Sequence, residues 1–136
     1  MDFILDNLAI GTAHEAHFYP QEIEAYLNVA EEANLVDPPE KYLKTYITDM
    51  HPIPIANLKE AISFIEQNIN EKKILVFCSS GVGRSPSVVI AFLCVALNFT
   101  FGEAVEYVAR KKPYMSILPE LVTTIDRLKD ELKVAA

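Results

Sequence analysis

Apolar residues gather in short runs at four places along the chain, and these runs predict β-strands. They are rich in strand-favouring residue types and too short for helices; they lie at residues 3–10, 26–30, 41–47 and 74–77. The first run is read as one or two short strands that end in a turn at Gly11. The last run, Ile-Leu-Val-Phe, contains no polar residue, so we expect a buried strand there.

A second pattern, in which apolar residues recur three and four positions apart, predicts helices. Residues 88–97 are apolar on every face, so their helix is expected to be buried all round at the centre of the fold. Thr100 and Glu103 have the spacing of a capping box, which marks the start of another helix. In total, helices are expected over residues 20–25, 55–69, 85–97, 100–112 and 118–132.

Strands that alternate with helices, followed by a run of helices, are typical of the α/β class. We therefore predict a single domain over residues 1–136, with a central, mostly parallel sheet flanked by helices. The composition agrees, because 51% of the residues are hydrophobic and 23% are charged, as in ordinary globular proteins. Such sheets bind ligands at the carboxyl ends of their strands, which directs attention to the loop after residue 77.

The loop between the buried strand and the buried helix has the composition of an anion-binding site. Ser85 is a good N-cap and Pro86 suits a first turn, so a helix is expected to start there with its positive end toward the loop. Arg84 adds a planar fork that matches two oxygens of a phosphate. The residues between are small, and their N–H groups can point inward; they are Ser79, Ser80, Gly81, Val82 and Gly83.

Cys78 ends the strand directly beneath this loop. Inward N–H groups, a helix terminus and Arg84 would all favour its thiolate, and the same donors suit the oxygens of a phosphate. The bare spacing of Cys and Arg would arise by chance in roughly one such chain in twenty, which leaves a buried core cysteine as the alternative. The strand, the two glycines and the capped helix favour a nucleophile beneath a bound phosphate.

The segment Cys78-Ser-Ser-Gly-Val-Gly-Arg84-Ser85 resembles the Cys-x5-Arg-Ser signature of the protein tyrosine phosphatase superfamily. Over most of the chain, the order of elements resembles the small dual-specificity members. The resemblance implies a dual-specificity phosphatase-like fold and a cysteine-dependent phosphatase that hydrolyses phosphotyrosine in proteins, and phosphoserine or phosphothreonine in dual-specificity members, through a phosphocysteine intermediate. One position departs from the pattern: the family usually has His before the nucleophile, whereas Phe77 offers no hydrogen bond.

Hydrolysis of a phosphate ester needs an acid that protonates the leaving oxygen, and Asp49 is the candidate. It follows the strand 41–47 on a proline-bounded loop, and the family's general acid occupies a similar loop at a strand end. The resemblance implies that Asp49 then serves as the base for water. The hydroxyl of Ser85 is expected to reach the sulfur as well as to cap the helix. An ordinary loop aspartate is the alternative for Asp49, with Asp37 and Glu40 as reserve acids.

No metal and no organic cofactor is expected, because Arg84 and the loop amides supply the charge stabilisation that the reaction needs. His14 and His17 are one residue short of the zinc-binding His-Glu-x-x-His spacing, so we interpret them as surface histidines. Arg110, which two lysines follow, is a candidate second anion site, as a matching arginine is in some relatives. Basic residues that only complement a helix dipole are the alternative. Cys94 lies in the apolar helix and is expected to be structural.

The net charge of −7 disfavours nucleic acid and acidic membranes as partners. The expected partner is a phosphorylated protein or peptide, and we expect a monomer. The apolar run 88–97 is too short to span a bilayer. Two cysteines without a disulfide framework fit a reducing, cytoplasmic setting.

Two other functions stay open. A non-catalytic module would capture a phosphorylated partner without turnover. A phosphatase for phosphoinositides often carries Lys in the loop, and one for RNA 5′ phosphates tends to be basic overall. The loop here is neutral at Ser79, Ser80 and Val82 and the chain is acidic, which disfavours both substrates.

Overall fold

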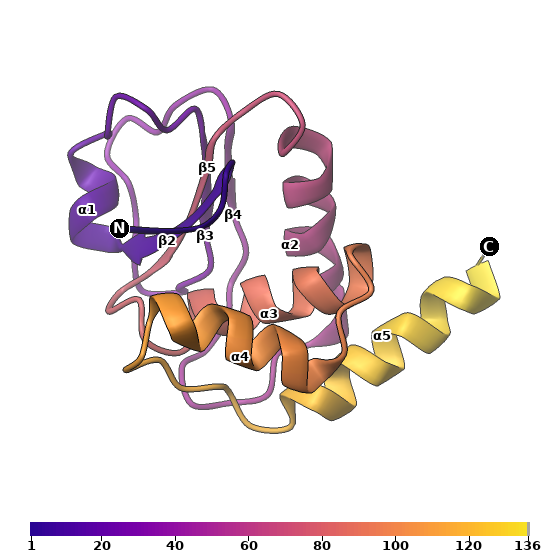
Figure 1. Ribbon diagram of the computed structural model, residues 1–136. Coiled ribbons are helices and arrows are strands. Elements are labelled where there is room, and N and C mark those ends of the chain that lie inside the picture. Colours follow the sequence, from indigo (N-terminus) through magenta and orange to yellow (C-terminus); the bar gives the residue numbers. More distant parts are fainter. Residues whose placement is uncertain (136) are drawn as a thin grey trace.

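A five-stranded sheet runs through the middle of the molecule in the strand order β1-β2-β5-β3-β4 (Figure 1). The computed structural model describes residues 1–135. The strands are β1 (Asp2–Leu5), β2 (Leu8–Thr12), β3 (Ala25–Asn28), β4 (Tyr42–Lys44) and β5 (Ile74–Cys78). β1 pairs antiparallel with β2, and the other neighbouring pairs are parallel. The prediction of a mostly parallel sheet is therefore confirmed.

β5 lies between β2 and β3, and all of its residues are buried. Because successive strand side chains point to opposite faces, Val76 and Cys78 join the larger core cluster and Phe77 joins the smaller one. In the register of the sheet, Cys78 lies beside Thr12, and Phe77 lies beside Asn28. The carboxyl ends of three parallel strands thus meet at one edge of the sheet, where the candidate loop begins.

Helices cover both faces of the sheet (Figure 1). They are α1 (Ala13–His17), α2 (Ile55–Asn68), α3 (Arg84–Ala96), α4 (Phe101–Lys111) and α5 (Leu121–Ala135). α1 packs on one face, and the other helices gather on the opposite side. α3 contacts α2, α4, α5 and β5, and its residues 84–94 are all buried. The central helix is therefore confirmed, and each buried Val, Ile or Leu of it stabilises the fold by about 1.5–3 kcal/mol.

The predicted start of the central helix is wrong by one residue, and this changes the role of Ser85. α3 begins at Arg84, its N-cap is Gly83, and no side chain caps it. Ser85 lies inside the first turn, where its hydroxyl oxygen is 3.2 Å from Sγ of Cys78. Ser85 is therefore not an N-cap, because a residue with helical backbone angles inside the turn cannot fold its side chain back over the N–H groups that follow it.

The segment 20–25 is not helical, contrary to the prediction. It turns into β3, and the N–H of Ala25 donates to the carbonyl oxygen of Lys73 at 3.1 Å. Bonding to the neighbouring segment of the sheet replaces the bonds of an isolated helical turn, which is marginal at that length. The short helix lies earlier instead: Thr12 and Glu15 form a capping box at the start of α1, which the sequence pattern did not reveal.

The remaining boundaries differ by a few residues. β3 and β4 are shorter than the runs that predicted them, and α2 and α4 start where expected. α5 begins at Leu121, three residues after its predicted start, because Leu118 belongs to the preceding loop. Within residues 1–135, none of the helices combines the length and the hydropathy that crossing a membrane requires.

Candidate active site

The loop 79–83 closes around the sulfur of Cys78, which is 1% exposed. The N–H of Gly81 donates to Sγ at 3.2 Å, and Oγ of Ser85 lies at the same distance from it. Gly81 has a φ of +73°, and a Cβ there would lie 3.1 Å from the carbonyl oxygen of Gly11. A glycine is therefore required at this turn. The loop thus donates one N–H to the sulfur, and Ser85 of α3 forms a second hydrogen bond with it in which either atom can be the donor.

The amino end of α3 adds a positive field at the same place. The helix starts directly at the end of the loop, and no side chain occupies its first N–H groups. Free N–H groups and the helix dipole together place a partial positive charge at this end, equivalent to roughly half an elementary charge. The strand, the loop and the helix end thus lie together where the sequence predicts an anion site.

The segment between α4 and α5 supports the loop from outside. The N–H of Ser116 donates to the carbonyl oxygen of Val82 at 2.8 Å. The N–H of Leu118 donates to the buried hydroxyl of Ser87 on α3 at 3.0 Å. This segment therefore holds the loop at Val82 and α3 at Ser87, while Ser79 and Ser80 stay exposed at the mouth.

Arg84 is 3% exposed, and it is held by neighbours from two other loops. Its Nη1 donates to Oε1 of Glu32 at 2.7 Å and to the carbonyl oxygen of Ile47 at 3.1 Å, and its Nη2 donates to Oε2 of Glu32. Its Nε lies 3.8 Å from Oδ1 of Asp49. The hydrogen bonds with Glu32 raise the pKa of Arg84 above its ordinary value, so the guanidinium is a permanent positive charge beside the loop.

Glu32 is a functional residue that the sequence reasoning missed. Its carboxylate accepts hydrogen bonds from Arg84 and from the hydroxyl of Ser79. The bonds from Arg84, with a smaller contribution from Ser79, lower the pKa of Glu32 to about 2. One signal could have found it: the pair Glu31-Glu32 lies just after a predicted strand, at the sheet edge where the nucleophile was also expected.

Asp49 lies at the mouth of the loop, as predicted for the acid. Its carboxylate is 56% exposed, and its Oδ1 accepts a hydrogen bond from the N–H of Met50 at 3.0 Å. A Cβ on Gly83 would lie 3.6 Å from Oδ1 of Asp49, so the carboxylate rests against the loop. The neighbouring Thr48 donates its hydroxyl to Oε2 of Glu31 at 2.7 Å, which ties the Asp49 segment to the segment that carries Glu32.

The two reserve acids, Asp37 and Glu40, are exposed, and within residues 1–135 no side-chain hydrogen bond or ion pair joins either to the loop. His17 bonds only to its own helix, with Nδ1 donating to the carbonyl oxygen of Ala13, and His14 packs edge-on against Phe18. Of the three candidate acids, Asp49 is thus the one that lies against the loop.

The basic residues at the end of α4 form ion pairs with different partners. Arg110 donates to Glu106 one turn earlier on the same helix, and both side chains are largely exposed. Lys112 pairs with Asp2 at 3.1 Å. Lys112 nevertheless lines a hollow of about 250 Å³ together with Val82 from the loop, so this lysine lies nearer to the site than Arg110 does.

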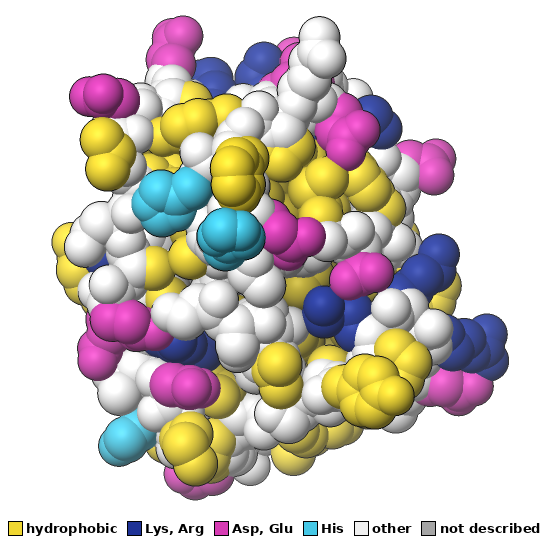
Figure 2. All heavy atoms as spheres, turned by 90° about the vertical axis from the view of Figure 1, so that its left-hand side faces the viewer, with side chains coloured by type: hydrophobic (Ala, Val, Ile, Leu, Met, Phe, Trp, Pro, Cys, Tyr) yellow, Lys and Arg dark blue, Asp and Glu magenta, His cyan; other side chains and the backbone are white. Residues whose placement is uncertain are grey.

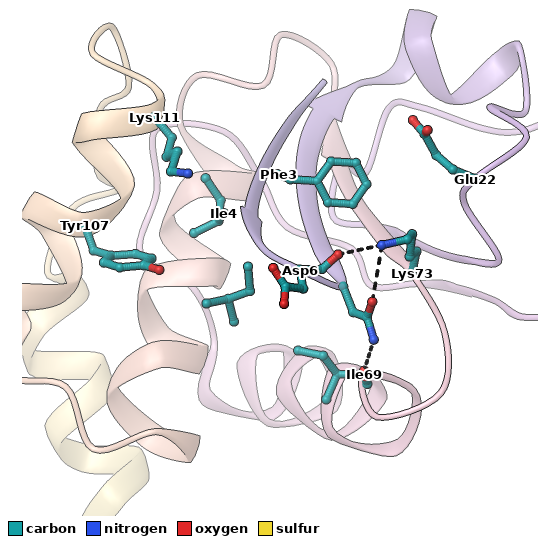
Figure 3. Close-up of a pocket in the computed structure, with 10 residues that line it drawn as sticks. Phe3, Ile4, Asp6, Glu22, Ile69, Lys73, Tyr107 and Lys111 are labelled. Atoms are coloured by element: carbon teal, nitrogen blue, oxygen red, sulfur yellow. Dashed lines mark hydrogen bonds between the residues drawn. The ribbon is translucent and has the colours of Figure 1, made fainter.

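A cavity of about 760 Å³ lies elsewhere (Figure 3). Its lining includes Lys73, whose Nζ donates to the carbonyl oxygen of Asp6 at 2.9 Å. Lys73 immediately precedes β5, whereas Cys78 ends it. A strand rises by about 3.3 Å per residue, so the cavity and the sulfur lie at opposite ends of the sheet, roughly 15 Å apart. The cavity is not the catalytic pocket.

A buried sulfur under inward N–H groups, with a guanidinium beside it and a carboxylic acid at the mouth, is the arrangement of a cysteine-based phosphatase. The chain matches the family described as dual specificity phosphatase, catalytic domain, over residues 10–130. It therefore belongs to this family, and the predicted resemblance to the small dual-specificity members of the protein tyrosine phosphatase superfamily is confirmed.

The relatives that the chain matches are also named as phosphatases. The chain is 32% identical to dual specificity protein phosphatase 5 of Rattus norvegicus over 120 residues, which cover 83% of this chain and 31% of that protein. It is 34% identical to the protein-tyrosine-phosphatase IBR5 of Arabidopsis thaliana over 67 residues, or 48% of this chain and 26% of the relative. The chain thus spans about a third or less of the length of these relatives.

Solved structures support the fold. Human DUSP28 superposes with a TM-score of 0.82 at 17% identity over the whole of both chains. Tk-PTP in the active form superposes with a TM-score of 0.80 at 24% identity over 95% of each chain. At these identities the similarity establishes the α/β phosphatase fold, while the assignment to the family comes from the sequence match.

Proposed function

We propose that this domain hydrolyses phosphotyrosine in proteins, and phosphoserine or phosphothreonine as well, through a phosphocysteine intermediate. One observation carries the proposal: the sulfur of Cys78 lies at the bottom of a loop whose Gly81 N–H and Ser85 hydroxyl both approach it at 3.2 Å. Such donors favour the thiolate, which is the nucleophilic form. The same loop offers further N–H groups to the oxygens of a phosphate.

In the first step, the thiolate of Cys78 attacks phosphorus and the bond from phosphorus to the ester oxygen breaks. The leaving oxygen takes a proton from Asp49, whose carboxyl group lies at the mouth of the loop. Arg84 and the N–H groups of the loop bind the equatorial oxygens, whose charge must be stabilised in the transition state.

In the second step, water attacks the phosphocysteine and the sulfur–phosphorus bond breaks. Asp49, now a carboxylate, accepts a proton from the water. The departing sulfur becomes a thiolate again, and the hydroxyl of Ser85 at 3.2 Å is placed to donate to it. No metal or organic cofactor takes part in this scheme.

Other substrates are weaker candidates. The loop is neutral at Ser79, Ser80 and Val82, and on the face that Figure 2 shows, acidic side chains lie beside the basic ones. This argues against an RNA 5′ phosphate. A phosphoinositide stays as the second candidate, because a solved structure of PTPMT1 in complex with PI(5)P shares the fold with a TM-score of 0.77 at 19% identity.

A second anion site for a neighbouring acidic or phosphorylated residue of the substrate also stays a proposal. An anion at Arg110 would compete with the carboxylate of Glu106. Lys112 lies in the hollow that Val82 also lines, which makes it the stronger of the two candidates. Both Cys78 and Cys94 are free thiols, which supports a reducing, cytoplasmic setting.

The test is phosphate release from a panel: p-nitrophenyl phosphate, phosphotyrosine and phosphothreonine peptides, and vesicles that contain PI(5)P. We expect turnover of the aryl phosphate and of the phosphotyrosine peptide, and no turnover of any substrate by Cys78→Ser. Binding of the peptides without release by the wild type would favour a non-catalytic module. Release from the vesicles alone would move the substrate to lipids.

A further inference from the structure

The turn that carries Asp49 projects from the body of the fold. Ile47 and Ile53 bracket this turn and are buried, whereas all five residues between them, 48–52, are exposed. Packing against the core therefore fixes the two ends of the turn but not its tip. The position of the acid depends on hydrogen bonds that the turn itself makes and on its contacts with neighbouring loops.

Two hydrogen bonds lie inside the turn, and both involve Asp49. The backbone N–H of Met50 donates to Oδ1 of Asp49 at 3.0 Å. The ring of His51 reaches back to the main chain and places Nδ1 2.7 Å from the carbonyl oxygen of Asp49. Because a carbonyl oxygen can only accept, Nδ1 of His51 carries the hydrogen of this bond. The next two residues thus bind the carboxyl group and the carbonyl group of Asp49.

Met50, which lies between these two partners, has a left-handed backbone with a φ of +61°. A residue with a Cβ rarely adopts this region, and it stays there only where the surrounding contacts hold it. The bond from the His51 ring to the carbonyl oxygen of Asp49 spans Met50. Pro52 follows directly and disfavours a helical backbone at His51. The ring of His51 therefore closes a tight turn around a residue that would not adopt this conformation by itself.

The two oxygens of the Asp49 carboxyl group have different surroundings. Oδ1 accepts from the N–H of Met50 and lies 3.8 Å from Nε of Arg84. An N–H donor and a guanidinium both stabilise an unprotonated oxygen, so the proton of the acid is carried by Oδ2. Within residues 1–135, Oδ2 takes part in no hydrogen bond or ion pair. The turn therefore leaves Oδ2 available to a substrate.

We infer that His51 is a positioning residue for the acid: its bond to the carbonyl oxygen of Asp49 locks the turn so that Oδ1 stays bound and Oδ2 presents the proton. This inference rests on the proposed function, in which Asp49 protonates the leaving oxygen. His51 acts through Asp49 and does not touch the substrate. Proton transfer needs the acid within hydrogen-bond reach of the leaving oxygen, and an exposed turn keeps that position only when its own bonds restrict it.

A competing role for His51 makes a different prediction, because an imidazole near the mouth could itself protonate the leaving oxygen. His51→Asn separates the two roles. Nδ2 of Asn, like Nδ1 of His, is bonded to Cγ and can donate to the same carbonyl oxygen, but an amide does not give up its proton to a substrate. His51→Asn therefore retains positioning and removes any acid catalysis by His51, whereas His51→Leu removes both.

The experiment compares kcat/KM for p-nitrophenyl phosphate with kcat/KM for phenyl phosphate. p-Nitrophenolate is a weak base and leaves readily, whereas phenolate is a stronger base that depends more on protonation. We expect His51→Leu to lower kcat/KM about tenfold for phenyl phosphate and less than about threefold for p-nitrophenyl phosphate. An equal effect on both substrates, or no effect, would overturn the inference.

His51→Asn is expected to stay within about threefold of the wild type for both substrates. A loss in His51→Asn as large as that in His51→Leu would contradict positioning and favour direct acid catalysis by His51. His17→Leu is the matched control, because Nδ1 of this exposed histidine also lies near a backbone carbonyl oxygen, that of Ala13 at 2.6 Å, but on α1. Its kcat/KM values are expected to stay within about twofold of the wild type.

A double variant tests whether His51 acts through Asp49. In an Asp49→Asn background, which has no proton to position, His51→Leu is expected to change kcat/KM for phenyl phosphate by less than about twofold. A further tenfold loss in that background would contradict action through Asp49. His51 is exposed, so the thermal unfolding midpoint of His51→Leu is expected to match that of the wild type.

The inference and the proposed function can fail separately. If the wild type hydrolyses both aryl phosphates but no phosphopeptide, the proposed protein substrate is wrong and the positioning role remains. If Asp49→Asn loses more activity with phenyl phosphate than with p-nitrophenyl phosphate while His51→Leu does not, only the inference is wrong. A wild type that hydrolyses neither aryl phosphate would overturn both.

Discussion

α3 and α4 begin in opposite ways, although both follow a short loop. At the start of α4, Thr100 accepts from the N–H of Glu103, and the side chain of Glu103 accepts from the N–H of Thr100. At the start of α3, Gly83 offers no side chain and the first N–H groups have no capping partner. The amino end of α4 is satisfied by its own residues, whereas that of α3 remains available to an anion.

The same contrast holds for two glutamates whose pKa values are lowered. The main cause of the lowered pKa of Glu103 is the hydrogen bond from the backbone N–H of Thr100, which is only three residues away. The main cause of the lowered pKa of Glu32 is the hydrogen bond from the guanidinium of Arg84, which is distant in sequence. Local capping at α4 therefore stabilises that helix. The site instead has an uncapped helix end at α3 and depends on groups that follow other strands.

The largest expected effect comes from a change of Asp49, which lies at the mouth of the loop before the uncapped helix α3. Asp49→Asn removes the proton donor while keeping the size of the side chain, so kcat for a phosphotyrosine peptide is expected to fall about 100- to 1,000-fold. The KM for the peptide is expected to change little, because Asp49 does not donate a hydrogen bond to the phosphate oxygens. Steady-state kinetics checks both values, and an unchanged kcat would assign the acid role to another residue.

A smaller loss is expected inside the first turn of α3. Ser85→Ala removes a hydroxyl 3.2 Å from Sγ of Cys78, and hydrogen bonds to charged groups are worth about 1.5–3 kcal/mol, so kcat is expected to fall about 10- to 100-fold. Since Ser85 does not cap the helix, the unfolding midpoint should barely move. Rapid-quench detection of the phosphoenzyme should reveal that it accumulates; a large loss of stability with normal turnover would instead indicate a capping role.

The matched substitution at the start of α4 should lower the stability and leave the activity unchanged. Thr100→Ala breaks the capping box of α4 and is expected to lower the free energy of unfolding by about 1 kcal/mol. Turnover of p-nitrophenyl phosphate should stay within twofold of the wild type. Denaturant unfolding and an activity assay on the same preparation test the pair, and a loss of activity at full stability would break the contrast between the two helices.

The smallest effect concerns acid stability. Glu32 has a folded-state pKa of about 2, below the ordinary value of 4.5. A lowered pKa stabilises the folded state above the ordinary value and loses this contribution as the pH falls through the folded value. The carboxylate is half exposed, so the contribution is at most about 1 kcal/mol after screening. The difference in unfolding free energy between the wild type and Glu32→Gln should therefore shrink between pH 5 and pH 2.5; a constant difference would contradict the ion pair as its source.

Local signals along the chain were sufficient for the nucleophile loop. The apolar run of β5, the small residues after it and the all-apolar helix behind it lie next to one another in sequence, so their geometry follows from short-range preferences. The same is true of the capping box of Thr100 and of the stripe that forms α2. The candidate acid Asp49 was found only with the help of the resemblance, because a loop carboxylate has no local signature.

What the amino-acid sequence determined by itself is the order of the strands and of the four longer helices α2 to α5, together with the cysteine loop, because hydrophobic period and glycine positions act over a few residues. What only the tertiary structure decided is the surroundings of Arg84: parallel pairing of β3 with β5 brings Glu32 across the sheet to its guanidinium. It also decided that Ser85 faces the sulfur rather than capping α3. Contacts between distant segments depend on strand order and register, which no local pattern of residues encodes.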